Sequence, residues 1–313
     1  MKYRKALVRA ASVGIAWMLL CCGCAGKRNA AQEQEIQSQE TVNQQPNAQR
    51  KDVQENVQPS PEMLEEDWSA YFDGLSGAAV LYDASAMQYR IYHKKLALTR
   101  RPPCSTFKII SALIALEYGI LDPAHSTRTW SGEEFWNAAW NQDLTFDKAF
   151  RESCVWYFRQ VADEIGQELM QKELDRLMYG NCDISDWEGR LNTNNQNRAL
   201  TGFWLESSLA VSPKEQAEAM ERIFGANSVY KEKTRQELKK VMQVEQAYTD
   251  ATIYGKTGTG MAGGIVVDAW FTGFAEKAGR QVFFCIYLGQ TDGKEVTSAA
   301  AKEIAVRLVG DLL

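Results

Sequence analysis

Histidine is almost absent from this sequence, which has only His93 and His125 in 313 residues. Neither stands among the convergent ligands that a zinc site needs or in the setting of a histidine-based triad, so we expect both at the surface or in packing. No metal site is predicted. A basic excess is also missing, because the formal net charge is -5, and nucleic-acid binders normally carry a basic face.

Cysteine is sparse in the body of the chain, where its spacing forms neither CxxC pairs nor a disulfide-dense scaffold. The body cysteines are Cys104, Cys154, Cys182 and Cys285. We expect buried free thiols. A bridge between Cys104 and Cys154 stays open.

Long apolar runs are lacking too, apart from residues 10–22 after a basic start. That run is short for a membrane span and typical of a secretion signal, which predicts a signal peptide over residues 1–23. Its end resembles the lipidation box of bacterial lipoproteins, with Cys24 as acceptor, although Cys21 stands where leucine is usual. An ordinary signal peptide or an uncleaved anchor is the alternative. We expect an extracytoplasmic protein held at the bacterial membrane by a lipid, or else a secreted one.

Large apolar and aromatic residues are rare between residues 26 and 61, where Gln, Asn, Glu and Ser dominate. Such a segment cannot bury enough surface to offset its ordering entropy. This composition predicts a disordered tether over residues 24–66 and a catalytic domain over residues 67–313.

The remaining pattern predicts an α+β fold, with an antiparallel sheet packed by helices and an inserted helical lobe. Strands at both ends of the chain would form the sheet, beginning with a hairpin. The strand segments are Gly77–Asp83, Gln88–Tyr92, 252–256, 266–274 and 282–288. A buried helix over 105–118, apolar all round, follows Pro102-Pro103, and a last helix covers 298–313.

Ser105 and Lys108 form an S-x-x-K pair, which places both side chains on one face of a helix, one turn apart. At a helix start the serine lies where free N–H groups favour developing negative charge. A lysine in a buried helix should have a lowered pKa and can act as a base. The pair therefore predicts a nucleophile and its base, although S-x-x-K alone is a common string.

Two further motifs make the prediction specific. Ser153-Cys154-Val155 follows 48 residues after Ser105, and Lys256-Thr257-Gly258 lies on a predicted strand before Thr259. A second serine can pass a proton to a leaving nitrogen. A strand-borne Lys-Thr-Gly offers a cation and a hydroxyl to a substrate carboxylate, with glycine allowing close approach. This grouping is typical of penicillin-recognising enzymes.

With these motifs, residues 68–313 resemble the class D β-lactamases. Further matching strings are Tyr179-Gly180-Asn181, Asp183-Ile184-Ser185, Phe203-Trp204-Leu205-Glu206, Val211-Ser212-Pro213 and Ala269-Trp270-Phe271-Thr272-Gly273. The resemblance implies the fold of penicillin-recognising serine β-lactamases and DD-peptidases. It also implies hydrolysis of β-lactam antibiotics.

The resemblance further implies roles for single residues. Ser105 would be acylated, and carbon dioxide would form a carbamate on Lys108 (N6-carboxylysine), the base of both half-reactions. Trp204 and Val155 would support that carbamate; the alternative is that Trp204 is a core aromatic that needs one polar partner. Ser153 and Lys256 would complete the catalytic set. Backbone N–H groups of Ser105 and Thr259 would form the oxyanion hole, and Thr257, Gly258 and Tyr179 would bind substrate. No other cofactor is expected.

The sequence departs from the family pattern in two places. Glu188-Gly189-Arg190-Leu191-Asn192 resembles the general-base loop of class A β-lactamases, which we interpret as a coincidence inside a longer link over 186–202. Residues 293–303 contain no arginine, although many class D enzymes bind the substrate carboxylate with one there. The missing arginine makes the chain similar to enzymes and sensors of Gram-positive bacteria.

Two other functions fit the same motifs. Sensor domains of β-lactam receptors share them and bind penicillins without fast release, and small penicillin-binding peptidases act on cell-wall peptides. The sequence lacks the H-E-x-x-H metalloprotease motif that accompanies receptor sensors. The hydrolase is therefore favoured, with β-lactams as small-molecule partners, no nucleic acid and an unknown oligomeric state.

Overall fold

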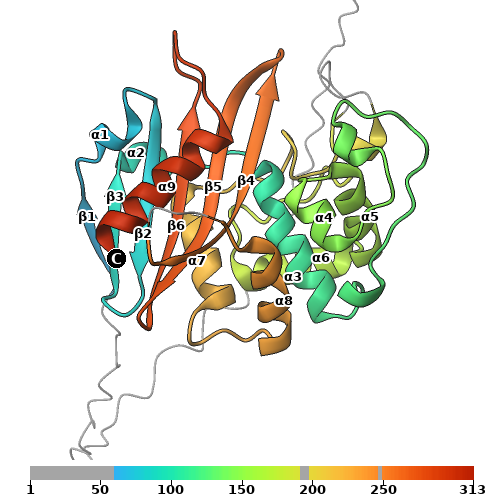
Figure 1. Cartoon of the computed structure of the whole chain (residues 1–313), viewed down its shortest axis with the longest axis horizontal. Helices are drawn as coiled ribbons and strands as arrows, with labels where there is room; N and C mark the ends of the chain where they lie inside the picture. The colour runs from blue at the N-terminus through green and yellow to red at the C-terminus, as the bar shows by residue number, and fades with distance from the viewer. Residues whose placement is uncertain (1–59, 191–196, 246–248) are drawn as a thin grey trace, which may run out of the picture. The chain divides into compact units, whose positions relative to one another are not determined.

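A six-stranded sheet forms the centre of the computed structural model, with strands in the order β1-β3-β2-β6-β5-β4 (Figure 1). The structure describes residues 60–190, 197–245 and 249–313. The strands are β1 (Glu62–Glu65), β2 (Gly77–Asp83), β3 (Gln88–Tyr92), β4 (Thr252–Ala262), β5 (Ile265–Lys277) and β6 (Arg280–Gly289). Neighbouring strands are antiparallel, except that β1 runs parallel to β3. The predicted α+β class and N-terminal hairpin are confirmed.

Early and late strands of the described fold meet in the middle of this sheet, where Gly77 to Asp83 of β2 pair with Val282 to Leu288 of β6. The first five residues of β2 are all buried, as expected for a strand covered on both faces. On one face lie α1 (Ser69–Phe72) and α9 (Ser298–Leu312), and on the other lies α7 (Pro213–Phe224). A short helix, α2 (Lys94–Ala97), follows β3.

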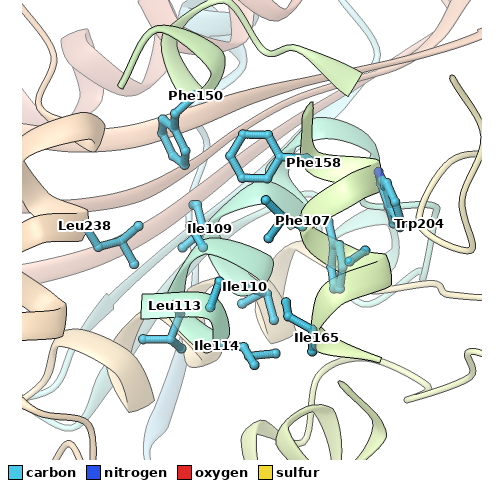
Figure 2. Packing of buried hydrophobic residues seen from close by; sticks show 14 of the residues in the cluster. Phe107, Ile109, Ile110, Leu113, Ile114, Phe150, Phe158, Ile165, Trp204 and Leu238 are labelled. Carbon is cyan, nitrogen blue, oxygen red and sulfur yellow. The ribbon is translucent and has the colours of Figure 1, made fainter. Parts of the chain in front are cut away.

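A helical lobe lies beside β4 (Figure 1) and holds most of the largest buried cluster. Its longer helices are α3 (Lys108–Glu117), α4 (Phe146–Arg151), α5 (Val155–Ile165), α6 (Gln167–Leu177) and α8 (Glu232–Met242). Four short 3-10 turns are η1 (Cys104–Phe107), η2 (Pro123–His125), η3 (Ala138–Trp140) and η4 (Arg198–Leu200). Helix α3 is buried from Lys108 to Ala115, and Figure 2 shows its apolar side chains packed between neighbouring helices.

Some boundaries differ from the sequence-based expectation. Strand β1 lies inside the segment 24–66 that was predicted to be a tether, and its four side chains are exposed. The predicted helix 105–118 begins as the 3-10 turn η1, and the predicted strand 252–256 continues to Ala262. The signal peptide and Cys24 lie outside the described residues. Among those that are described, no helix is both long and apolar enough to cross a membrane.

The four body cysteines are free thiols, three of them buried, so the open Cys104–Cys154 bridge is absent. His93 and His125 are both exposed, as expected. Within the described ranges no group of His, Cys, Asp and Glu side chains could hold a metal ion.

Candidate active site

The turn η1, which carries the predicted nucleophile Ser105 and is called the nucleophile turn below, connects an extended segment to the buried helix α3. Cys104 has a φ of 50°, a left-handed conformation that is uncommon for a residue other than glycine. Its backbone N–H donates to the carbonyl oxygen of Trp204 across 3.0 Å. Strained backbone of this kind persists only where surrounding contacts hold it, and it clusters at functional sites. This turn leaves Ser105 half-buried between two fully buried neighbours.

Lys108 lies directly behind the nucleophile, with its Nζ 2.9 Å from Ser105 Oγ. The lysine is buried among apolar side chains, and Nζ lies 5.6 Å from the centroid of the Phe158 ring. Burial lowers the pKa of Lys108 to about 8, since the charged form loses its hydration. A neutral amine is therefore accessible beside Ser105 near physiological pH. The lowered pKa agrees with the expectation for a lysine in a buried helix, and its role as a base stays a prediction.

Ser153 and Lys256 form a second pair, with Lys256 Nζ 3.0 Å from Ser153 Oγ. Ser153 lies in the turn between α4 and α5 with a φ of 57°. Lys256 Nζ also donates to the carbonyl oxygen of Thr257 across 3.1 Å. Burial lowers the pKa of Lys256, and the nearby charge of Lys108 lowers it further. The two serine–lysine pairs thus belong to one site, and Lys256 is placed to serve Ser153 more than to present a free cation.

Gly258 brings β4 against the nucleophile turn. A Cβ atom at this position would lie 3.0 Å from Thr106 Cγ2 and 3.1 Å from the carbonyl oxygen of Pro103. The glycine was predicted to admit the ligand, whereas the structure shows that it admits η1. This close packing sets Thr259, the next residue on β4, beside the turn that carries Ser105.

Three hydroxyl groups lie on β4 and at the start of α9, where a substrate carboxylate is predicted to bind. Thr259 is exposed, and its Oγ1 donates to Ser298 Oγ at the start of α9 across 3.1 Å. The region 293–303 offers Lys294, but its Nζ donates to the carbonyl oxygen of Asp73. The three hydroxyl groups are those of Thr257, Thr259 and Ser298.

Trp204 packs tightly beside the nucleophile turn. Its ring stacks on Phe107, with centroids 5.7 Å apart and an interplanar angle of 20°, and Figure 2 shows the two side chains next to one another. A Cβ atom at Gly202 would lie 2.4 Å from this ring, so a glycine is needed there. The indole Nε1 is buried without a hydrogen-bond partner. A buried donor without a partner is costly, which makes it a candidate to bind an anionic group.

The comparisons with known proteins agree with this geometry. A family model described as the penicillin binding protein transpeptidase domain matches residues 30–310.

The chain belongs to this penicillin-recognising family.

Its relatives include both enzymes and receptors. The probable β-lactamase YbxI of Bacillus subtilis (strain 168) is 34% identical over 214 residues, covering 68% of this chain and 74% of YbxI. The regulatory protein BlaR1 of Bacillus licheniformis is 30% identical over 253 residues, covering 80% of this chain but 39% of BlaR1. The chain therefore spans about two fifths of that regulatory protein.

Solved structures divide in the same way. The C-terminal domain of the Bacillus licheniformis BlaR penicillin receptor has a TM-score of 0.69 and 30% identity, covering 81% of this chain and 98% of that domain. A class D β-lactamase from Bacillus subtilis has a TM-score of 0.66 and 30% identity, covering 79% and 95%. The resemblance to class D β-lactamases is thus confirmed, together with the fold that it implied.

Within this penicillin-recognising fold, Tyr179 lies elsewhere than predicted. Its side chain is fully buried, its hydroxyl bonds to Gln216 Oε1 across 3.2 Å, and its ring packs on Phe107 at 5.9 Å. Gln216 Nε2 in turn donates to Thr106 Oγ1. A residue enclosed in this way cannot touch a substrate. Tyr179 supports the nucleophile turn from behind, and its prediction as a binding residue is wrong.

The contacts of Glu188 and Gly189 bear on the string that resembles the class A general-base loop. Glu188 is exposed and pairs with Arg198, while Lys108 is the group that lies against Ser105. Gly189 has a φ of 70°, and a Cβ there would meet the backbone of Gly202 at 2.3 Å. Leu191 and Asn192 lie outside the described residues. Glu188 therefore belongs to a surface link of this penicillin-recognising protein, as the coincidence interpretation expects.

Sequence reasoning missed two residues that shape the site. Trp140 Nε1 donates to the carbonyl oxygen of Glu152 across 2.9 Å, which fixes the turn that carries Ser153. Arg159 is buried on α5, and its guanidinium carbon lies 5.9 Å from the Trp204 ring centroid. The tryptophans before Ser153 were a signal for the first. A charged residue on a helix gave no signal for the second.

Proposed function

We propose that this protein hydrolyses β-lactam antibiotics through an acyl-enzyme on Ser105. The observation that carries the proposal is the pairing of two serines with two buried lysines, Ser105 with Lys108 and Ser153 with Lys256. Opening of a lactam needs a base at the attacking oxygen and an acid at the leaving nitrogen. Each pair can supply one of these.

We propose that the first half-reaction uses both serine–lysine pairs. Ser105 Oγ attacks the lactam carbonyl while its proton passes to the base at Lys108. Backbone N–H groups of Ser105 and Thr259 hold the developing oxyanion, and removing such a donor typically costs about 3 kcal/mol. Ser153 donates its proton to the lactam nitrogen, and Lys256, within 3.0 Å, replaces it.

We propose a carbamate on Lys108 as the base that works in both half-reactions. Carbamate formation needs a neutral amine, and burial lowers the Lys108 pKa to about 8. The buried indole Nε1 of Trp204 has no hydrogen-bond partner, and the Phe158 ring belongs to the apolar surroundings of the amine. Val155 is partly buried against the same apolar cluster as Phe158. When present, the carbamate supplies a carboxylate base that can also activate the hydrolytic water.

A receptor-like role is the second candidate, because the similarity to BlaR1 covers 80% of this chain. A receptor needs only the acylation of Ser105 and gains nothing from hydrolysis of the acyl-enzyme. Enzyme and receptor therefore differ in the second half-reaction alone.

Steady-state hydrolysis of nitrocefin at several bicarbonate concentrations tests the enzyme proposal. We expect many turnovers per molecule, rising with bicarbonate, and none in Ser105→Ala. Stoichiometric colour change without turnover at saturating bicarbonate would favour the receptor role instead.

We also propose that the chain is exported and lipidated at Cys24, which places the site on the outer side of the cell membrane. Metabolic labelling with palmitate in a bacterial host tests this. Label is expected in the full-length chain and absent from Cys24→Ala. Label that persists in Cys24→Ala would contradict the assignment.

A further inference from the structure

Arg159 is a buried cation in contact with the indole that the proposed function uses. It lies on α5, one residue after Phe158, and is 4% exposed. Its guanidinium carbon lies 5.9 Å from the Trp204 ring centroid and 5.6 Å from that of Trp187. A guanidinium at this range from an indole is attracted by the ring quadrupole.

The guanidinium is itself held from two sides. Nη1 donates to the carbonyl oxygen of Trp187 across 2.8 Å, and Nε donates to Asp163 Oδ2 across 3.1 Å. The side chain of Asp163 is 51% exposed, so water screens this carboxylate and leaves part of the Arg159 charge effective inside. The Trp187 ring stacks on Phe203 at 5.1 Å. Arg159 therefore connects the backbone of Trp187 to the ring of Trp204.

Consecutive residues of α5 thus contact Lys108, which would carry the proposed carbamate, and Trp204, whose indole would bind it. The Phe158 ring lies below Lys108 Nζ at 5.6 Å, and Arg159 lies against Trp204. A cation in this cluster also favours negative charge nearby, because the apolar surroundings screen it weakly. Arg159 has both a mechanical and an electrostatic route to the site.

We propose that Arg159 is a positioning residue that holds the Trp204 indole toward Lys108 and stabilises an anionic carbamate there. The proposal rests on the proposed function for the carbamate, but not for the contact between Arg159 and Trp204. It gives the residue a role in how much carbon dioxide the protein needs.

Three variants test the proposal. Arg159→Gln removes the charge and keeps an amide donor for the Trp187 carbonyl, while Arg159→Lys keeps the charge without the planar guanidinium. Arg128→Gln is the matched control, because Arg128 also lies over an aromatic ring of α5, Tyr157 at 5.0 Å, and pairs with Glu164. Each variant is compared with wild type by thermal unfolding first.

Two readouts are needed. The indole ¹⁵N–¹H resonance of Trp204, assigned from its loss in Trp204→Phe, reports how well the ring is held. The ¹³C carbamate signal, recorded against dissolved ¹³CO₂, reports occupancy of Lys108. In Arg159→Gln we expect faster solvent exchange of the indole proton and half-occupancy at about fivefold more carbon dioxide, equal to about 1 kcal/mol. Arg159→Lys should be intermediate, and Arg128→Gln should match wild type.

The outcomes separate the two proposals. An unchanged indole resonance and unchanged occupancy in Arg159→Gln overturn the positioning role, and so does an equal change in Arg128→Gln. A wild type without any carbamate signal overturns the base proposal alone. The indole resonance then decides for or against Arg159 by itself. If Arg159→Gln does not fold, Arg159→Lys carries the same comparison.

Discussion

Lys256 Nζ lies 3.0 Å from Ser153 Oγ, although the two residues are 103 positions apart in the sequence. The contact joins a sheet strand to the turn between two helices. Other contacts fix both partners. Trp140 Nε1 donates to the carbonyl oxygen of the residue before Ser153, and Lys256 is buried away from solvent.

Lys256→Met should slow acylation on the order of 100-fold, because Ser153 then loses the group that restores its proton. Rapid-quench mass spectrometry of Ser105 acylation by benzylpenicillin measures this rate. Lys239→Met is the control, since Lys239 is a part-buried lysine that pairs with Glu276 outside the site. Equal rates in Lys256→Met and wild type would exclude the relay.

The pKa of Lys108 near 8 predicts a pH dependence of carbamate formation. Only the neutral amine reacts, and the carbamate that forms releases a further proton. Below pH 8, where the ammonium form must lose two protons in all, the carbon dioxide needed for half-maximal turnover should rise about a hundredfold for each unit that the pH falls. Above pH 8, where one proton is released, it should change only about tenfold per pH unit. Dissolved carbon dioxide, and not total bicarbonate, must be held constant in this titration. A flat dependence between pH 6 and 8 would contradict a neutral-amine requirement.

Trp204→Phe keeps an aromatic ring against Phe107 but removes Nε1. Deacylation should slow on the order of 10- to 100-fold, the worth of one hydrogen bond to a charged group. Trp270→Phe is the matched control, because Trp270 Nε1 is also buried without a partner but its ring packs on Tyr287 in the sheet. Burst kinetics with nitrocefin separate acylation from release. The same defect in both variants would assign the effect to packing.

Gly258→Ala should reduce acylation on the order of 100-fold, since its methyl group would push β4 away from η1 and displace the Thr259 N–H. Gly310→Ala, in α9, is the control glycine, because its added Cβ would meet only the Thr249 side chain. Single-turnover acylation is measured for both. A Gly258→Ala variant as fast as wild type would show that the close packing is not needed.

Tyr179→Phe tests the corrected role of that residue. Losing its bond to Gln216 should lower the free energy of unfolding by about 1 kcal/mol and leave KM unchanged. Urea unfolding and steady-state kinetics measure the two quantities. A raised KM at unchanged stability would restore Tyr179 as a substrate contact.

Much of the fold could be predicted, because its signals are local. Apolar runs predicted β2, β5, β6 and the buried helix α3, and S-x-x-K predicted the contact between Ser105 and Lys108. K-T-G pointed to Lys256, which the structure places against Ser153. Strand β1 escaped because its four residues are exposed and carry no apolar alternation. The 3-10 form of η1 was not predicted, and the turn is bonded to a residue 100 positions away through the hydrogen bond from Cys104 to Trp204.

The residues that support the site could not be predicted either, because their roles depend on contacts between segments that are distant in the sequence. From the sequence alone Arg159 is expected to be a solvent-exposed charge on a helix. The structure shows instead that its guanidinium lies against the rings of Trp187 and Trp204. The string Tyr179-Gly180-Asn181 suggested a binding residue. That the Tyr179 ring is enclosed and packs on Phe107 is seen only in the folded structure. Gly258 reads as a ligand-facing glycine, and only the approach of η1 shows otherwise.

The second half-reaction tests the central claim most directly. Wild-type protein is acylated with a small excess of benzylpenicillin, and intact mass is followed at saturating and at depleted carbon dioxide. The account predicts that the Ser105 adduct disappears within seconds at saturation, with hydrolysed product formed, and persists when carbon dioxide is removed. An adduct that persists at both concentrations would contradict hydrolysis and leave a penicillin-binding receptor.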